Sequence, residues 1–318
     1  MDNFAVEARQ LRKQFGDLQA VRGVDFGVQH GEVFSLLGPN GAGKSTTISM
    51  LAGLLRPSGG DASIMGHSVT RDARRAREAL GMVPQDIALY PDLSARENLT
   101  FWGRMYGLGG TLLRQRVDET LETIGLTDRQ HGRVGTFSGG MKRRVNIGVA
   151  LLHHPQVVIM DEPTVGIDPQ SRRHILDNVK DLNRKGMTVL YTTHYMEEAS
   201  ELSNHIAIMD QGQVIAYGTE TELIKLVGEQ DRLELHVNCS HEQVTAAWRT
   251  IPGVCSITTS EPDEAEGIIT LLVEDANLVL PRLFDSARAI ACRITSVAIH
   301  EPNLEAVFLH LTGRALRD

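Results

Sequence analysis

One glycine-rich segment has the residue types and the spacing of a phosphate-binding loop. It fits the pattern G-x-x-x-x-G-K-[ST] and runs Gly38, Pro39, Asn40, Gly41, Ala42, Gly43, Lys44 and Ser45, with Thr46 next in the chain. Glycines let backbone N–H groups turn inward around phosphate oxygens. The Lys44 ammonium would neutralise the β- and γ-phosphates, and the Ser45 hydroxyl would coordinate Mg²⁺. The segment therefore predicts a site for a nucleoside triphosphate with Mg²⁺.

Two adjacent carboxylates, Asp161 and Glu162, follow an apolar run at residues 157–160. An apolar run of this kind suits a strand of a parallel sheet, and the carboxyl end of such a strand abuts the phosphate crevice. We expect Asp161 to serve the metal ion and Glu162 to orient and deprotonate the attacking water. The pair predicts a nucleotidase with a separate metal partner and general base.

Strands and helices that would position these groups can be read along the first two thirds of the chain. Strands are predicted at residues 33–37, 157–160 and 188–192, and a hairpin at 205–217. A helix is predicted over 44–55, stopped by Pro57, and another after Asp168, which has the position of an N-cap before Pro169. Residues 85–135 are mostly helical, with helices at 96–106 and 112–124. We interpret about 86–145 as a helical subdomain.

The chain changes character after about residue 226, which suggests domains at 1–226 and 227–318. Strand-like runs at 233–237, near 257, at 268–273 and at 294–299 alternate with helical patterns at 244–251 and 281–289. Pro281 is expected in the first turn of the second of these helices. The order is βαββαβ, that of a ferredoxin-like α+β domain, followed by a terminal helix at 303–311.

Composition and charge narrow the class of protein. The chain has 318 residues, of which 42% are hydrophobic and 23% charged, as in globular proteins. Its formal charge of −8 argues against nucleic acid as a partner. No stretch approaches the roughly 18 apolar residues of a membrane span, and the first residues show no export signal. We expect a cytoplasmic protein.

The three cysteines, Cys239, Cys255 and Cys292, are odd in number and far apart in the sequence. They have no C-x-x-C spacing, and therefore predict neither a disulfide framework nor a zinc site. We expect reduced thiols in the core.

A short motif between the glycine-rich loop and the carboxylate pair resembles a family signature. Phe137-Ser138-Gly139-Gly140-Met141 is similar to the Leu-Ser-Gly-Gly-Gln signature of the ATP-binding cassette (ABC) family, and it opens a helical run at 141–152. A helix N-terminus there offers a second phosphate contact, from Ser138, Gly139 and Gly140. The substitutions Phe137 and Met141 put any polar contact of the usual glutamine in doubt. Of Lys142, Arg143 and Arg144, we expect one to face a partner subunit and the others to be solvated.

Other motifs of the same family are matched in the same order. Gln85 resembles the Q-loop glutamine, Asp168 the D-loop aspartate and His194 the switch histidine, while Phe15 lies where an aromatic ring stacks on adenine. The resemblance covers residues 4 to about 218. It implies an α/β P-loop NTPase fold with an ABC ATPase domain, ATP and Mg²⁺ as cofactors, and Gln85 beside Ser45 and Asp161 at the metal.

In the ABC family two ATPase domains pair head to tail, so that the signature of one caps the ATP on the loop of the other. This chain has both halves of that interface, which permits a homodimer with two competent sites. A heterodimer also remains open. The resemblance implies that ATP closes the dimer, that hydrolysis through Glu162 releases it, that His194 positions the γ-phosphate, and that a membrane permease receives the motion.

The end of the chain resembles one branch of the family. The segment Glu301-Pro302-Asn303-Leu304-Glu305-Ala306-Val307-Phe308-Leu309-His310-Leu311-Thr312-Gly313 is similar to the ending of drug-exporter ATPase subunits, including the daunorubicin-resistance type. This implies an ATPase on the inner face of the membrane that powers a separate permease. Two alternatives stay open: a soluble ABC ATPase that acts on DNA or the ribosome as a mechanical or regulatory protein, and a nucleotide-gated binding module with slow turnover.

Overall fold

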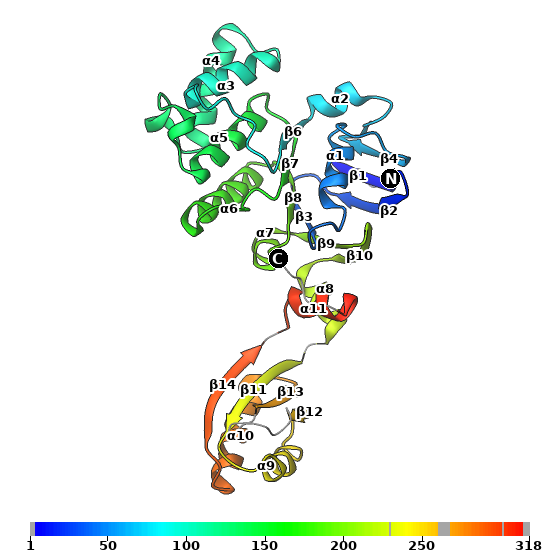
Figure 1. Ribbon diagram of the computed structural model, residues 1–318, viewed down its shortest axis with the longest axis vertical. Coiled ribbons are helices and arrows are strands. Elements are labelled where there is room, and N and C mark those ends of the chain that lie inside the picture. Colours follow the sequence, from blue (N-terminus) through cyan, green and yellow to red (C-terminus); the bar gives the residue numbers. More distant parts are fainter. Residues whose placement is uncertain (1–3, 229, 260–267, 301, 314–318) are drawn as a thin grey trace. The chain divides into compact units, whose positions relative to one another are not determined.

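The computed structural model describes residues 4–228, 230–259, 268–300 and 302–313 and divides the chain into two units, with the boundary between Glu220 and Thr221 (Figure 1). The first unit has two sheets. Its helices and strands are β1 (Val6–Phe15), β2 (Leu18–Val28), β3 (Val33–Leu37), α1 (Lys44–Leu51), β4 (Gly59–Ile64), β5 (His67–Ser68), α2 (Ala73–Glu78), β6 (Leu80–Val83), α3 (Ala95–Met105), α4 (Gly110–Thr123), α5 (Gly139–Leu151), β7 (Val157–Asp161), α6 (Pro169–Arg184), β8 (Thr188–Thr193), α7 (Met196–Leu202), β9 (His205–Asp210) and β10 (Gln213–Gly218).

The larger sheet has the order β10-β9-β3-β8-β7-β6. Its strands β6, β7, β8, β3 and β9 run parallel, and β10 closes the edge as an antiparallel hairpin partner of β9. Every residue of β3, β7 and β8 is buried, as expected of strands covered on both faces. The predicted strands and hairpin are confirmed.

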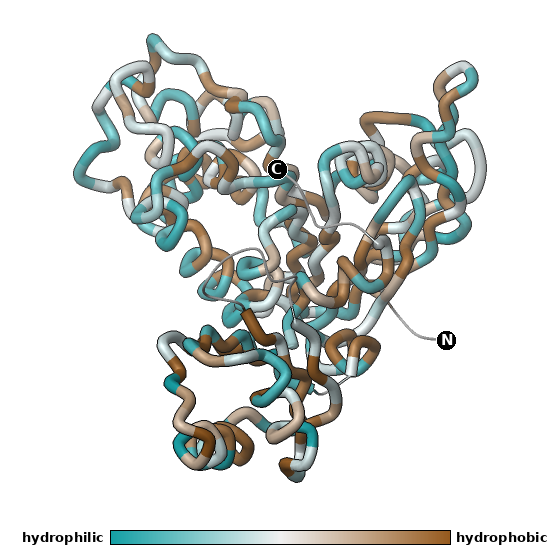
Figure 2. The backbone as a smooth tube through the Cα atoms, turned by 60° about the horizontal axis from the view of Figure 1, so that its bottom comes forward, coloured by the Kyte–Doolittle hydropathy of each residue, from teal (hydrophilic) through white to brown (hydrophobic). Residues whose placement is uncertain are grey.

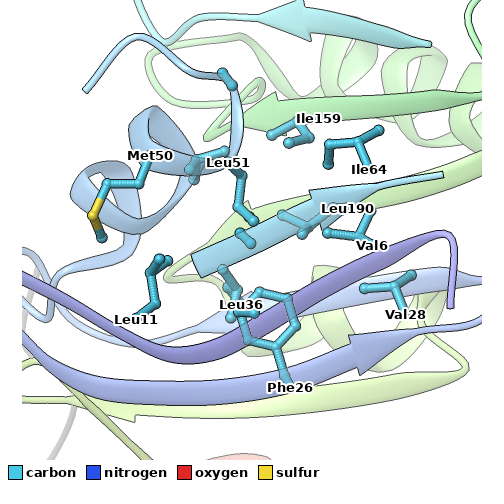
Figure 3. Packing of buried hydrophobic residues seen from close by; sticks show 14 of the residues in the cluster. Val6, Leu11, Phe26, Val28, Leu36, Met50, Leu51, Ile64, Ile159 and Leu190 are labelled. Carbon is cyan, nitrogen blue, oxygen red and sulfur yellow. The ribbon is translucent and has the colours of Figure 1, made fainter. Parts of the chain in front are cut away.

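Alternate residues of these strands enter two different cores. Phe34, Leu36 and Ile159 pack with the antiparallel sheet β2-β1-β4-β5 and helix α1 (Figure 3). Val158 and Tyr191, on the other face, pack with residues of α5, α6 and α7. The carboxyl ends of the strands are thereby fixed between two packed layers.

Helices α3, α4 and α5 lie together and share a core of their own (Figure 1). Ser94 caps α3 in a capping box with Glu97, in which each residue bonds the backbone of the other. The backbone tube in Figure 2 alternates between hydrophilic and hydrophobic positions through the helical segments, as amphipathic helices do.

The second unit begins with α8 (Glu220–Ile224), which spans the boundary. It continues with β11 (Asp231–Val237), α9 (His241–Trp248), β12 (Val254–Thr259), β13 (Ile268–Val273), α10 (Ala276–Ala289), β14 (Ile294–His300) and α11 (Leu304–Thr312). Its antiparallel sheet has the order β12-β13-β11-β14, the ferredoxin-like arrangement predicted from the sequence. Glu301, part of the C-terminal motif, lies outside the described residues.

Three predicted helices have other limits in the structure; the one expected at 244–251 is α9, which runs from His241 to Trp248. The helix expected to reach residue 55 ends at Leu51, because Gly53 adopts a left-handed φ of +68° that stops the helix before Pro57. Helix α10 begins at Ala276 rather than Pro281, because Asp275 caps it by accepting a hydrogen bond from the Asn277 N–H. Pro281 therefore lies inside the helix.

The prediction of three reduced core thiols was also wrong. Cys239 and Cys292 form a disulfide, with Cα atoms 5.4 Å apart, and Cys255 is exposed. Cys239 lies just beyond β11 and Cys292 just before β14, and these two strands are neighbours in the sheet. Sequence spacing alone does not reveal that proximity.

No helix in the described part of the chain is both long enough and apolar enough to cross a membrane.

Reduction of the Cys239–Cys292 bond should destabilise the second unit by about 2–4 kcal/mol, because the bond closes a long loop in the unfolded chain. Trp248, buried in this unit, reports its unfolding by fluorescence in a Trp102→Phe background. The midpoint in denaturant should fall when reductant is added, and Cys255→Ser should not change it. An untreated protein that titrates as three free thiols would contradict the assignment.

Candidate active site

The glycine-rich loop connects the end of β3 to the start of α1, as the motif requires. Gly43 has φ +100°, and a Cβ atom there would lie 2.7 Å from the Ala20 carbonyl oxygen. At Gly38 a Cβ atom would lie 2.3 Å from the Met209 carbonyl oxygen. Glycine is therefore required at both positions by backbone approach.

The Lys44 side chain is almost fully buried beneath this loop. Its ammonium donates hydrogen bonds to the carbonyl oxygens of Gly38 at 2.6 Å and Pro39 at 3.1 Å. The same nitrogen lies 3.0 Å from Glu162 Oε1, in an ion pair whose side chains are 4% and 5% exposed. A buried charge needs such a partner, so the two predicted catalytic groups hold each other in place.

Asp161 ends β7 at the carboxyl edge of the sheet. It accepts hydrogen bonds from Thr192 Oγ1 at 2.8 Å and Ser45 Oγ at 3.3 Å. Burial raises the pKa of this carboxyl above its ordinary value, and the bonds from Thr192 and Ser45 oppose that shift. Sequence reasoning missed Thr192, whose signal is a hydroxyl residue near the end of an otherwise apolar buried strand.

Glu162 leaves the strand in an unusual conformation, with φ +43°. A left-handed φ is uncommon for glutamate and is held here by a hydrogen bond from the Glu162 N–H to Thr192 Oγ1 at 3.0 Å. Its Oε2 lies 3.4 Å from His194 Nδ1 and accepts a 3.5 Å hydrogen bond from Gln85 Nε2. The strained turn thus brings the carboxylate to Lys44, Gln85 and His194.

A cavity of about 570 Å³ opens over the loop. Its wall includes Phe15, Pro39, Asn40, Gly41, Gly43, Lys44, Ser45, Thr46, Gln85 and Glu162 from the predicted set, together with Leu18, Gln19, Ala20, Arg22, Gln211 and Gly212. The Phe15 ring is 47% exposed and lies in the cavity wall, with the Lys13 ammonium 5.0 Å from its centroid. The second group of lining residues, from β2 and the β9–β10 turn, was not predicted.

The oxygen atoms near the loop fit Mg²⁺. Ser45 and Asp161 are hydrogen-bonded to each other, and Gln85 donates to Glu162, the residue next to Asp161 in the chain. Hydroxyl, carboxylate and amide oxygens are the ligands that Mg²⁺ accepts. These three residues would hold the ion.

The predicted signature and D-loop residues form a second group, and none of them lines the cavity. Ser138 is the N-cap of α5 and accepts a hydrogen bond from the Met141 N–H, while Asp168 caps α6 through the Ser171 N–H. A Cβ atom on Gly140 would lie 2.1 Å from Ser171 Oγ, so α5 and α6 approach closely here. Ser138, Gly139 and Asp168 are exposed. The predicted site residues therefore fall into two separate groups on the chain.

Both departures in the signature are packing residues. Phe137 is buried in the core shared by α3, α4 and α5, and the Met141 side chain packs against that core. Their apolar side chains therefore join the signature to the helical subdomain, while the Ser138 cap remains intact.

The expectation for the three cations after the signature needs correction. Arg143 is buried and donates hydrogen bonds to the carbonyl oxygens of Pro84 at 2.7 Å and Gln85 at 2.5 Å. Arg144 donates to the carbonyl oxygens of Ile124 and Gly125. Burial lowers the pKa of Arg143, yet its guanidinium remains the donor that connects α5 to the Gln85 loop. Arg143 is therefore buried rather than solvated, and both arginines donate to backbone carbonyl oxygens.

A phosphate loop at the end of a parallel strand, a buried lysine and a carboxylate pair define a P-loop ATPase. The pattern described as "ABC transporter" matches residues 21–165. The linearmycin resistance ATP-binding protein of Bacillus subtilis (strain 168) is 47% identical over 313 residues, which cover 98% of this chain and 100% of that protein. The chain belongs to the ABC transporter family, and the resemblance and fold class predicted from the sequence are confirmed.

Another relative and two solved structures support the same family assignment. The daunorubicin resistance ATP-binding protein DrrA2 of Streptomyces coeruleorubidus is 38% identical, over 98% of this chain and 96% of that protein. A solved ATP-binding subunit of an ABC transporter aligns with a TM-score of 0.63 and 31% identity, covering 70% of this chain and 93% of that one. A dimeric ATP-binding cassette in a post-hydrolysis state with ADP and Pi aligns with a TM-score of 0.61 and 27% identity. The alignment covers 67% of this chain and 98% of that one.

Asp161→Asn should stabilise the nucleotide-free protein at neutral pH while abolishing Mg²⁺-dependent turnover. Because burial raises the pKa of Asp161, the fold favours the neutral carboxyl, and stability is lost as pH rises through that raised pKa. The midpoint of thermal unfolding should be higher for Asp161→Asn than for the unchanged protein at pH 7. The difference should be smaller near pH 4, close to the ordinary pKa of an aspartate, about 3.9.

Asp181→Asn, an exposed carboxylate on α6, is the control and should show neither effect. A destabilisation of Asp161→Asn that is equal at both pH values would contradict the assigned cost of burying the charge.

Proposed function

We propose that this chain is the ATP-hydrolysing subunit of an exporter, in which two copies close head to tail on ATP and drive a separately encoded membrane permease. The observation that carries the proposal is the division of the predicted site residues. Most of those around Lys44 line one cavity, whereas the exposed Ser138, Gly139 and Asp168 do not. A second copy can supply the missing half in a two-fold arrangement.

Within each composite site the Lys44 ammonium binds the β- and γ-phosphates. Glu162 then exchanges its ion-pair partner for the attacking water, which it orients and deprotonates as general base. His194, whose side chain is 9% exposed, lies 3.4 Å from Glu162 and holds the γ-phosphate beside it. Bound Mg²⁺ supplies neutralisation of phosphate charge. Ser45, Asp161 and Gln85 offer it oxygen ligands.

The adenine base stacks on Phe15, and the Ser138, Gly139 and Gly140 segment of the second copy caps the triphosphate. The N-terminus of α5, which begins at Gly139, offers unpaired N–H groups and the positive end of its dipole to that phosphate. Binding of ATP therefore brings two copies together, and loss of the γ-phosphate separates them.

The export role rests on the relatives. One is a linearmycin resistance protein, two are daunorubicin resistance proteins, and others are Nod factor export ATP-binding proteins. All are called ATP-binding proteins, so the substrate path belongs to a separate permease. The ATPase then lies on the inner face of the cell membrane, held by that permease.

A docking position for the permease is supported by two exposed apolar side chains that follow Gln85. Ile87 is 38% and Tyr90 46% exposed. Gln85 itself bonds to Glu162, and Arg143 holds the backbone of the same loop. A permease segment seated on Ile87 and Tyr90 would be connected to the catalytic carboxylate through one short loop.

Glu162→Gln should keep ATP binding and lose at least about 100-fold in turnover, because a general base contributes roughly 10²–10⁴-fold. With ATP the variant should sediment as a long-lived dimer. Lys44→Ala should instead lose nucleotide affinity. Normal turnover in Glu162→Gln would contradict the base assignment, and unchanged affinity in Lys44→Ala would contradict the phosphate site.

Affinity purification of the tagged chain from detergent-solubilised native membranes should recover a polytopic membrane protein in stoichiometric amount. Ile87→Asp should lose it, because a charge would be buried at the interface. Leu112→Asp, an exposed apolar position on α4, is the matched control and should retain it. Recovery of ribosomal or DNA-associated proteins alone would contradict the export role.

A further inference from the structure

A buried carboxylate outside the nucleotide cavity connects the segments that carry the catalytic residues. Glu198 lies on α7 and is 3% exposed, and it does not line the cavity over the phosphate loop. A buried carboxylate is costly unless it is hydrogen-bonded. The hydrogen-bond partners of Glu198 therefore identify the segments that it connects.

Three hydroxyl groups donate to the two oxygens of Glu198. Thr164 Oγ1 donates to Oε1 at 2.7 Å. Thr193 Oγ1 and Tyr191 OH donate to Oε2 at 2.9 and 3.0 Å. Burial and the neighbouring Glu198 charge raise the pKa of Tyr191, so that its hydroxyl remains a donor. Hydrogen bonds to an ionised acceptor are about twice as strong as neutral ones.

Two of these donors lie close in the chain to predicted catalytic residues. Thr193 immediately precedes His194, and Thr164 lies two residues after Glu162. Glu198 accepts from Thr193 with one oxygen and from Thr164 with the other. One carboxylate thus spans from the His194 segment to the Glu162 segment.

The far side of His194 is fixed by the same group of residues. The Tyr195 N–H donates to Thr193 Oγ1 at 2.9 Å, so the residue after His194 is bonded to the residue before it. The Arg172 guanidinium lies over the Tyr195 ring at 4.4 Å, and its Nε lies 3.6 Å from Glu198 Oε1. Residues on both sides of His194 are therefore linked to Glu198.

We propose that Glu198 is a positioning residue for ATP hydrolysis, which fixes the His194 imidazole relative to the Glu162 carboxylate. It does not line the nucleotide cavity and acts through Thr193 and Thr164. The network explains why a carboxylate, rather than an apolar residue, occupies this place in the core: three hydroxyl donors on two different segments need a shared acceptor.

Glu198→Gln is the direct test, because it keeps the shape and removes one acceptor. An amide can accept with one oxygen only, so either the Thr164 side or the Thr193 side meets an NH₂ group. We expect kcat to fall at least about 10-fold, since misplacement by 1 Å can cost about 100-fold. The KM for ATP should change less than about twofold, because the cavity wall is untouched.

Glu201→Gln is the matched control. Glu201 also lies on α7 and bonds to α6 through Arg173 and Lys180, but it is exposed. Glu198 also faces α6, through Arg172, so Glu201→Gln likewise removes a carboxylate between α7 and α6. It should leave kcat unchanged. An equal fall in both variants would overturn the proposal, as would a lower melting temperature of Glu198→Gln with unchanged kcat.

The His194→Ala background tests the route. With no imidazole to position, adding Glu198→Gln should cause no further loss of kcat, whereas multiplicative losses would overturn the proposal. If Glu198→Gln does not fold, Thr193→Val removes the hydroxyl next to His194 and should give the same selective fall in kcat.

The inference rests on the proposed roles of Glu162 and His194. Experiments can distinguish a failure of those roles from a failure of the inference about Glu198. Full turnover in Glu162→Gln and His194→Ala would remove those roles. Loss of turnover in both, with full turnover in Glu198→Gln, would overturn the inference about Glu198 alone.

Discussion

The buried ion pair between Lys44 and Glu162 is the constraint on which the site depends. An ammonium with 4% exposure needs a counter-charge, and Glu162 supplies it at 3.0 Å. Glu162 makes this contact from a left-handed backbone conformation, φ +43°, so the ion pair helps to offset the strain of the turn. In the proposed mechanism, phosphate replaces this carboxylate as the partner of Lys44, and Glu162 is then free to bind the attacking water.

The parallel sheet makes this arrangement possible. Strands β3, β7 and β8 are buried on both faces, so their carboxyl ends are rigid and lie side by side. Each of these ends carries one part of the site: the loop before Lys44, the Asp161–Glu162 pair or the Thr193–His194 segment. Ser138 and Asp168, the exposed caps of α5 and α6, do not line the cavity, and in the proposed dimer they face a second copy.

The sequence predicted correctly those features that depend on residues close together in the chain. The strand at 33–37 and the Asp168 cap were predicted as they occur, because continuous apolar runs and an Asp-Pro start are strong signals. Sequence could not predict the Thr192 bonds, the Arg143 contact with the Gln85 loop or the Cys239–Cys292 bond. Each joins residues distant in the chain, and only the assembled fold brings them together.

The central claim is that the two half-sites meet between chains, and a mixed cross-linking experiment tests it most directly. In a Cys255→Ser background, one protein would carry Asn40→Cys in the phosphate loop and the other Ser138→Cys in the signature; both positions are exposed. The account predicts a covalent dimer of the two different proteins when ATP is added without Mg²⁺, and little without ATP. Cross-linking that ignores ATP, or none at all, would contradict it.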